Sequence, residues 1–472
     1  MSCSKDIEGI SRDQIALLVQ VSALILWIVL FVSDVQAKVS SEEAARLGND
    51  LTAMGANPKG NASGSIPAYS GVMLGAPKWV NYKGSGTFYP NPYPDEKPLF
   101  VITSKNFREY ENNLSEGQIA LFKMYPDTFR LPIYPPKRDT RYNHFTQSNT
   151  KINATQAELL PNGTGIAHAF GGIPFPIPQN GEELAYNNQY APNLFANTGE
   201  IAAGTVFNDG STSIETRIED RYFEYFDESV KRENYSDLAA RVVIEWTGPA
   251  REKGKVVLVH EYSNLGKSPR NAWQYLPGNR RVRRAPTISY DYPDGPGGLR
   301  TVDDALVFNG ATDRFTWKME GMREMFVPYN NNELDNPKYN YKKILTLHHL
   351  NPEVMRYELH RCWVLLGELK PGKRHLYGKR RLFMDEDSWA GLLSDNYDQG
   401  GVLMRTNMRS LVNLYDLPGM GPRVEVYHDL PKRAYHAVNL INEEKGPPKL
   451  VNKNIWGEDY FSPANLRKMG KR

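Results

Sequence analysis

Residues 241–262 read RVVIEWTGPAREKGKVVLVHEY, two apolar runs on either side of a short polar connection. The runs are Arg241–Trp246 and Lys255–Tyr262. Their valines, isoleucine and aromatic residues favour pleated strands, and the stretch 248–254 has the glycines expected of a hairpin connection. We therefore expect two neighbouring antiparallel strands here.

Similar runs follow along the rest of the chain, each bounded by turn-forming residues. They are residues 315–327, 356–366, 375–384, 409–415, 423–428 and 435–441. The 27 Tyr, 18 Phe and 8 Trp also suit strands better than helical bundles. We find no repeat of fixed period, which disfavours solenoids and propellers. The predicted fold class is α+β and mainly β, with one large curved antiparallel sheet and a few helices.

Helices are expected mainly in the first third of the chain. Ser115 and Gln118 have the spacing of a capping box, which predicts a helix over 116–124 that ends before a proline. Shorter helices are predicted at 41–48, where Ser40 and Glu43 form a second box, and at 104–110.

Two segments are predicted to lie outside regular structure. Residues 50–93 are rich in Gly, Asn, Pro and Ser and predict an extended N-terminal arm that lies on the body of the protein. The stretch 172–178 alternates proline with Ile173, Phe175 and Ile177, and its missing amide donors exclude it from a central strand. We expect it to form an edge or a strap that covers the mouth of a cavity.

The N-terminus predicts export from the cytoplasm. Ile15–Val32 is almost wholly apolar, but its unbroken part, Ala23–Val32, has the length of a signal-peptide core and is shorter than the ~20 residues of a membrane-spanning helix. Small residues at 35–37 can form a cleavage site. We expect residues 1–37 to be a signal peptide and 38–472 a single domain in the periplasm. An uncleaved anchor in the inner membrane is the alternative.

Charge, cysteines and motifs narrow the possible functions. The 57 basic residues are nearly balanced by 54 acidic ones, so no overall field favours nucleic acid. Cys3 leaves with the signal and only Cys362 remains, so no internal disulfide is expected. The sequence has no Gly-x-Ser-x-Gly elbow, His-Glu-x-x-His motif or phosphate-binding glycine loop. We therefore expect neither an enzyme nor a cofactor.

Two clusters of polar residues permit another interpretation. Asp385–Asp387 could supply the acid and base of a hydrolase that acts on envelope glycan or lipid, which is the alternative function. We favour pairing of these acids with the basic run Lys379–Arg381 on a neighbouring strand. His348 and His349 are the pattern closest to a metal site, but neighbours on a strand point to opposite faces, so a structural role is expected.

Several blocks of the chain match a known family pattern. They include RLGNDLTAMGA at 46–56, GSIPAYSG at 64–71, DEKPLF at 95–100, LSEGQ at 114–118, YPDTFR at 125–130, WQYLPG at 273–278, RRVRR at 280–284, KRR at 379–381 and DEDSW at 385–389. On these blocks the chain resembles a proteobacterial periplasmic family of unknown function that is related to the outer-membrane lipoprotein-sorting proteins LolA and LolB.

This resemblance implies a fold and a function. The fold would be an incomplete antiparallel β-barrel wrapped over helices, with an apolar cavity for an acyl chain or other hydrophobic cargo. The function would be periplasmic carriage of a hydrophobic molecule, a lipid or a lipoprotein-like cargo. The partners would be an inner-membrane exporter of the resistance-nodulation-division type and an outer-membrane protein. Because no lipobox precedes a cysteine, lipid anchoring is not expected.

Three groups of side chains are the candidates for ligand binding. The first consists of aromatic residues in β runs that could line a pocket or fill a core, namely Trp246, Trp273, Tyr275 and Trp317. The second is the proline-rich strap with Ile173, Phe175 and Ile177. The third is Arg281 and Arg283, which share a face of a strand and could hold an anionic headgroup. For these arginines we favour ion pairing with Asp291, Asp294, Asp303 and Asp304.

Overall fold

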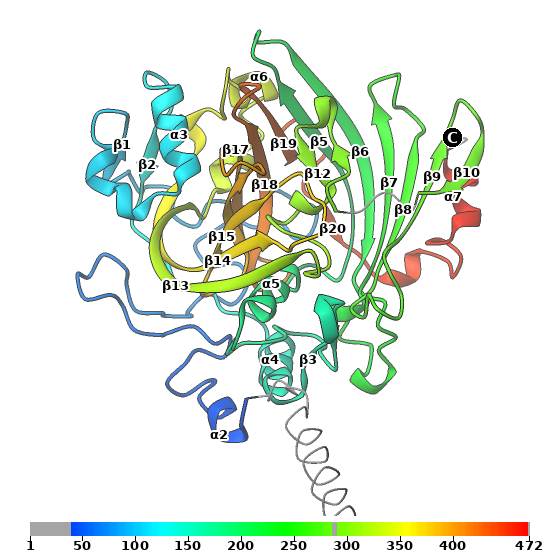
Figure 1. Cartoon of the computed structure of the whole chain (residues 1–472), viewed down its shortest axis with the longest axis horizontal. Coiled ribbons are helices and arrows are strands. Elements are labelled where there is room, and N and C mark those ends of the chain that lie inside the picture. Colours follow the sequence, from blue (N-terminus) through cyan, green and yellow to red (C-terminus); the bar gives the residue numbers. More distant parts are fainter. Residues whose placement is uncertain (1–38, 286–289, 471–472) are drawn as a thin grey trace, which may run out of the picture.

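The computed structural model describes residues 39–285 and 290–470, and the predicted signal peptide lies outside these residues. Sixteen strands form one large sheet (Figure 1). Its strands are β1 (Phe100–Ile102), β2 (Leu131–Ile133), β5 (Ala196–Val206), β6 (Thr212–Tyr222), β7 (Ala240–Gly248), β8 (Val256–Glu261), β9 (Asn271–Leu276), β10 (Arg281–Arg284), β13 (Phe315–Pro328), β14 (Tyr357–Leu369), β15 (Lys379–Asp385), β16 (Gly391–Tyr397), β17 (Leu403–Leu414), β18 (Gly419–Asp429), β19 (Ala434–Leu440) and β20 (Lys449–Leu450). Two small separate pairs are β3 (Glu158–Leu159) with β4 (Ile166–Ala167) and β11 (Pro293–Asp294) with β12 (Arg300–Thr301).

The strand order shows an open, almost entirely antiparallel sheet. The order is β1-β2-β14-β15-β16-β17-β18-β19-β5-β6-β7-β8-β9-β10, with β13 beside β14 and β20 beside β5. Among the described strands of this sheet, only β2 and β14 pair in parallel. The predicted hairpin is confirmed, because β7 and β8 are antiparallel neighbours with Val243 opposite Leu258. The prediction of a mainly β fold with one large antiparallel sheet is confirmed.

The α-helices are short. They are α2 (Ser41–Ala44), α3 (Glu116–Met124), α4 (His144–Gln156), α5 (Gly181–Gln189), α6 (Tyr341–Ile344) and α7 (Pro463–Met469). Of these, α2 packs on α4, away from the sheet. The predicted helix 116–124 is confirmed together with its capping box, since Ser115 Oγ accepts the amide of Gln118 and Gln118 Oε1 accepts the amide of Ser115. The other two predictions are partly wrong. Helix α2 ends at Ala44, and a 3-10 helix at Phe107–Asn113 replaces the predicted helix 104–110.

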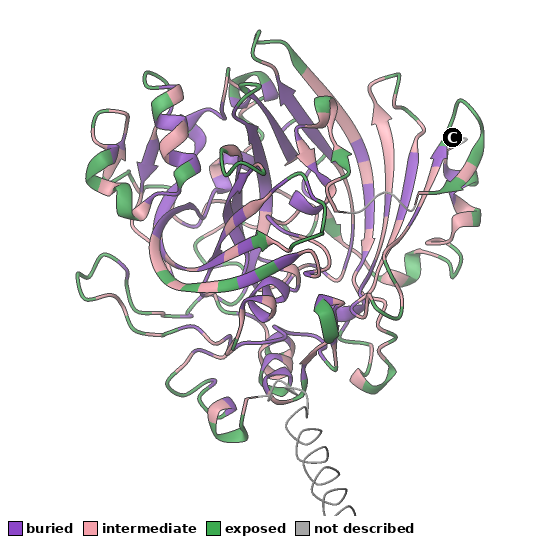
Figure 2. Cartoon of the chain, viewed as in Figure 1, coloured by how far each residue is buried: buried purple, intermediate pink, exposed green. Residues whose placement is uncertain are grey.

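The two faces of the central strands have different chemistry. On one face, alternate residues of β17 and β18 such as Met408, Val424 and Val426 belong to the largest hydrophobic core. Helix α3 also contributes residues to this core. On the opposite face, alternate residues such as Arg409 and Glu425 are buried and polar. Figure 2 shows that burial is most complete over β14–β19 and weaker along β6–β9. The strongest apolar packing therefore lies beside β17 and β18.

The arm and the proline-rich strap both lie on this body. Residues 50–93 contain no helix or strand, as predicted, and hydrogen bonds from distant residues hold them in place. The strap is fixed between α4 and α5: Ile173 donates its amide to Thr150 Oγ1 and accepts from Asn153 Nδ2, while Asn187 bonds both backbone groups of Phe175. Ile173 is fully buried. The segment is therefore packed as part of the core, and the expectation of a movable cover at an edge is corrected.

No helix in residues 39–285 or 290–470 is long and apolar enough to cross a membrane.

Candidate ligand-binding cavity

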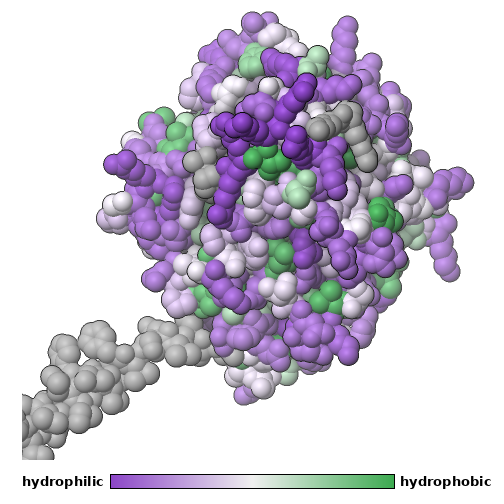
Figure 3. All heavy atoms as spheres, turned by 90° about the vertical axis from the view of Figure 1, so that its right-hand side faces the viewer, coloured by the Kyte–Doolittle hydropathy of each residue, from purple (hydrophilic) through white to green (hydrophobic). Residues whose placement is uncertain are grey.

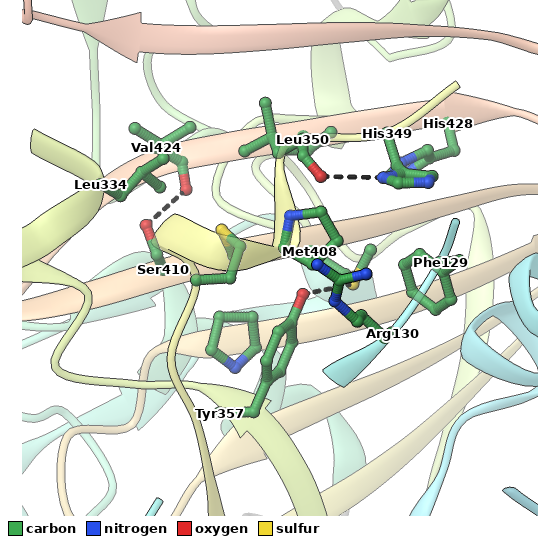
Figure 4. Close-up of a pocket in the computed structure, with 14 residues that line it drawn as sticks. Phe129, Arg130, Leu334, His349, Leu350, Tyr357, Met408, Ser410, Val424 and His428 are labelled. Atoms are coloured by element: carbon green, nitrogen blue, oxygen red, sulfur yellow. Dashed lines mark hydrogen bonds between the residues drawn. The ribbon is translucent and has the colours of Figure 1, made fainter. Parts of the chain in front are cut away.

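A narrow cavity lies on the apolar face of β17 and β18. The cavity itself is small, about 20 Å³, and it continues into a wider space of about 410 Å³ that includes open solvent. Because side chains alternate along a strand, Met408 and Ser410 of β17 and Val424, Val426 and His428 of β18 all face this space. Figure 4 shows these walls together with the residues that close them from other elements. The remaining lining residues are Phe129, Arg130, Pro328, Leu334, His349, Leu350, Pro352, Met355 and Tyr357.

Most polar side chains in the cavity wall have a partner within the protein. Ser410 donates to the carbonyl of Val424 at 2.9 Å, and the Tyr357 hydroxyl faces the sulfur of Met408 at 3.9 Å. His349 uses both ring nitrogens, with Nδ1 2.8 Å from the Leu350 carbonyl and Nε2 2.9 Å from Thr128 Oγ1. These groups are satisfied and present little unused polarity to the cavity.

His428 is different, because neither of its ring nitrogens has a hydrogen-bond partner among the described residues. The residue is only 3% exposed. Burial lowers the pKa of His428 to about 3, the nearby His349 acts in the same direction, and the backbone of Thr406 opposes the shift weakly. The imidazole is therefore neutral at physiological pH, and neither its donor nor its acceptor makes a well-formed hydrogen bond within the described residues, with only the backbone of Thr406 acting on the ring.

Arg130 supplies the only guanidinium of the cavity lining. Its side chain is 43% exposed, and its Nη2 lies 3.6 Å from Glu353 Oε1 at the surface. An exposed ion pair of this length contributes little to stability. Arg130 is therefore free to meet a polar group of a guest, and Figure 4 shows it among the lining side chains.

The cavity is suited to holding apolar groups. Its walls are mainly aliphatic, and Met355 and Met408 are unbranched side chains that can change rotamer to admit a guest. A narrow space of this kind has to widen by such movements before it holds a long alkyl chain. Each buried CH₂ of a guest would contribute about 0.8 kcal/mol.

The structure does not bring the predicted ligand-binding residues together in this cavity. Trp317 packs with Ile173 in one hydrophobic cluster, Trp273 and Tyr275 lie beneath α7 in a second, and Phe175 belongs to a third. Ile177 contacts the small cluster around α2, and Trp246 lies under the ammonium of Lys255 at 4.4 Å. Trp273, Tyr275 and Trp317 therefore pack in cores that are separate from the cavity, and Trp246 is half-buried on β7 outside them.

Arg281 and Arg283 are exposed on β10, beside the partly buried Val282. The face of the molecule around β10 and α7 is mostly hydrophilic, with small separate apolar patches (Figure 3). The expected ion pairing is wrong, because the four acids serve other arginines. Asp291 pairs with Arg314, Asp294 with Arg300, and Asp303 and Asp304 with Arg380.

Sequence reasoning missed the residues that form the cavity. Val424, Val426 and His428 lie in a predicted strand, and their alternation places one histidine on an apolar face. That pattern was the available signal. The pattern does not by itself indicate a cavity, because the loops that carry Phe129, Leu350 and Met355 form its other walls.

A second cluster of titratable groups lies away from the cavity and has the spacing of a metal site. His360, Asp385 and Asp387 bring possible ligand atoms within 4.8 Å of one another. However, His360 lies between two carboxylates, with Nε2 3.1 Å from Glu358 and Nδ1 3.5 Å from Asp385. Burial opposes its charge, but the hydrogen bonds to Asp385 and Glu358 outweigh this and raise the pKa of His360 to about 9. A protonated imidazole has no free lone pair for a metal, and its positive charge already balances the neighbouring carboxylates. The cluster therefore does not fit a metal site.

The acids of this cluster hold the N-terminal arm. Arg138 pairs with Asp387 and Glu386, and also donates to the backbone carbonyls of Asn57, Lys59 and Pro67. The predicted ladder between Asp385–Asp387 and the basic run Lys379–Arg381 is therefore wrong. In that run, Arg380 pairs with Asp303 and Asp304, and Arg381 with Glu116 and Glu320.

His348 and His349 have separate structural roles, as predicted. His348 is half-buried and stacks on Tyr125 with ring centroids 4.3 Å apart, while His349 is buried. The two rings therefore do not form a joint metal site.

The fold and the site together define a mainly β protein in which a large open sheet carries a narrow apolar cavity on one face. The chain belongs to the family described as "Protein of unknown function (DUF1329)", whose model matches residues 101–467. It is 40% identical over 460 residues to "Uncharacterized protein PA3922" of Pseudomonas aeruginosa, which covers 95% of this chain and 98% of the relative. The family resemblance seen in the sequence is confirmed.

Several solved structures resemble the chain in part. A DUF1329 family protein from Desulfovibrio piger gives a TM-score of 0.41 at 14% identity and covers 60% of this chain and 96% of its own. A putative outer membrane lipoprotein-sorting protein domain from Vibrio parahaemolyticus gives 0.40 at 14% identity, with 60% and 97% covered. The LolA superfamily protein NE2245 from Nitrosomonas europaea gives 0.36 at 12% identity, with 60% and 100% covered.

Proposed function

We propose that this protein is a periplasmic binding protein or carrier for a hydrophobic molecule, which it holds in the cavity between β17, β18 and the loops that cover them. The observation that carries the proposal is the mostly aliphatic lining of a narrow cavity that opens to solvent and would widen around a guest. A guest in this space would gain free energy by leaving water, without any chemical step.

The cargo would be a lipid, a single acyl chain or a comparable molecule. The flexible Met355 and Met408 side chains would move aside to admit it. Export by the predicted signal peptide places the protein where it could exchange cargo with an inner-membrane exporter and an outer-membrane protein. These partners are part of the proposal.

The hydrolase alternative has less support from the site. Among the described residues, Glu183 is a buried acid with a raised pKa that accepts the Gln179 amide at the start of α5. The other buried acids with a raised pKa are Glu386 and Asp395, and all three lie outside the cavity lining. Glu386 is held by Arg138 and Arg361 beneath the arm, and Asp395 accepts hydrogen bonds from the N-terminal end of α3. All three carboxylates are thus accounted for by structural contacts.

Filling the cavity tests the proposal. Val426→Phe should occupy the space and reduce binding of the neutral fluorophore N-phenyl-1-naphthylamine at least tenfold, and overpacking should cost no more than about 1–3 kcal/mol of stability. Val402→Phe is the matched control, because Val402 is 63% exposed and does not line the cavity. Equal binding by the wild type and both variants would contradict the proposed site. Native mass spectrometry of the detergent-free protein would then show whether any lipid is retained.

A further inference from the structure

The cavity has one polar side chain that the protein itself leaves unused. Ser410, Tyr357 and His349 all have partners within the chain, whereas both ring nitrogens of His428 lack one. Buried polar groups normally find a partner, so each exception calls for an explanation. This exception lies in the wall of an apolar cavity, where a guest molecule can reach it.

The position of His428 explains why the backbone of Thr406 acts on its ring but no side chain forms a hydrogen bond with it. The residue is the last apolar-face position of β18, two residues beyond Val426, and lies opposite Thr406 of β17. The neighbouring ring of Tyr435 is tilted, with centroids 5.6 Å apart, and its hydroxyl donates to the Thr346 carbonyl instead. His349 lies nearby (Figure 4), but its two nitrogens are already engaged.

The unused groups define what kind of partner would fit. A neutral imidazole has one N–H donor and one nitrogen acceptor. A hydroxyl or an undissociated carboxylic acid can both donate and accept. An ester can only accept, and an alkane does neither. A group with two negative charges would need several cationic partners, and Arg130 is the only guanidinium in the lining.

We propose that the ligand is an amphiphile with a single hydroxyl or carboxyl group, and that this group hydrogen-bonds to His428 while the alkyl part lies along Val424, Val426 and Met408. The inference rests on the proposed function and adds the chemical class of the ligand. His428 acts here as a specificity-determining residue. It selects among molecules of equal length by their polar end.

Competition experiments can measure this selection directly. Dodecan-1-ol, lauric acid and methyl laurate would each displace N-phenyl-1-naphthylamine from the full-length mature protein. We expect the alcohol, and the acid at a pH low enough to keep it undissociated, to bind about tenfold more tightly than the ester, because the ester cannot donate a hydrogen bond. In His428→Phe this preference should disappear, while methyl laurate should bind as well as to the wild type or better.

Two further variants separate the role of His428 from general damage to the fold. His348→Phe changes a neighbouring histidine that does not line the cavity and stacks on Tyr125, a contact that a phenyl ring can also make, and it should retain the preference. His428→Gln keeps a donor and an acceptor, and it should retain at least part of the preference. NMR of ¹⁵N-labelled histidine in the wild type provides an independent readout: dodecan-1-ol should shift the His428 ring nitrogens, and methyl laurate should shift them less.

The outcomes of these experiments are distinct. If the wild type binds all three competitors equally, or if His428→Phe keeps the preference, the headgroup role is overturned and the apolar cavity still stands. If His428→Phe keeps the preference and the His428 ring signals of the wild type do not move on adding dodecan-1-ol, His428 pairs with a buried water only. If neither the fluorophore nor any competitor binds, the proposed function itself fails.

Discussion

Arg138 and Asp387 form a two-pronged ion pair across 249 residues of sequence, with Nε 2.7 Å from Oδ2 and Nη2 2.8 Å from Oδ1. The same guanidinium donates to the backbone of Asn57, Lys59 and Pro67 in the N-terminal arm. A planar guanidinium can serve these acceptors together because its five N–H groups have a fixed geometry. The arm is therefore held to the body by a buried side chain, and this relationship can be tested.

Arg138→Ala should release the arm and destabilise the protein. It leaves Asp387 and Glu386 in a buried site without their main partner, and such losses typically cost about 3–5 kcal/mol. Limited proteolysis should then cut within residues 57–93, and urea unfolding should give the loss of stability. Arg46→Ala is the control, since its pair with Asp50 is exposed and is worth less than about 0.5 kcal/mol. Equal protease resistance of Arg138→Ala and the wild type would contradict the anchoring role.

Stability should fall as the pH rises from about 6.5 to 9. The pKa of His360 in the folded protein is about 9, above its ordinary value of 6.5, so the folded state binds this proton more tightly. The stabilisation is complete below pH 6.5 and is lost as the pH rises through 9. Its size is on the order of 1–3 kcal/mol. Burial and the neighbouring Asp387 raise the pKa of Glu386 from its ordinary value of 4.5 to about 7. The contribution of Glu386 to stability is therefore also lost as the pH rises, but over the lower range that ends near pH 7.

The measurement is the free energy of unfolding in urea at several pH values, for the wild type and for His360→Gln. The variant cannot gain the charge, so its stability should change less between pH 7 and 9. If the unfolding free energies of the wild type and His360→Gln depend on pH in the same way, His360 is not protonated in the folded protein.

His428→Leu should stabilise the protein although it impairs the proposed binding. The wild type leaves two buried ring nitrogens without partners, and an apolar side chain removes that cost, a gain of about 1 kcal/mol. His349→Leu should do the opposite and cost about 1–2 kcal/mol, because it leaves Thr128 and the Leu350 carbonyl without their partner. Thermal unfolding of both variants checks the contrast, and a destabilised His428→Leu would argue that His428 has a structural partner such as water.

Ser115→Ala should destabilise the region around α3 by about 1–2 kcal/mol. The hydroxyl accepts the amide of Gln118 and donates to the buried Asp395, so both bonds are lost together. Hydrogen exchange of the α3 amides would locate the effect. Ser63→Ala, at an exposed position, should change stability by less than about 0.5 kcal/mol. A global loss without faster exchange in α3 would contradict the local origin.

The parts of the fold that could be predicted are those with local signals. The capping box at Ser115 and Gln118 placed α3 to the residue, because both partners lie within one helical turn. The runs around Val243 and Leu258 placed a hairpin for the same reason. By contrast, α4 reads HFTQSNTKINATQ and has no apolar periodicity, so it was not predicted. Its helix is fixed by the Asn143 cap and by packing against the strap and the arm.

The sequence by itself determined the strand composition, the dominant antiparallel pairing, the extended arm and the family, since these depend on residues close in the chain or on motifs in order. Only the tertiary structure decided which partner each buried charge has and where the apolar space remains. Asp303 could have met Arg281 or Arg380, and Asp387 could have met Arg381 or Arg138. The choice depends on strand register and loop closure over hundreds of residues, which local sequence does not encode.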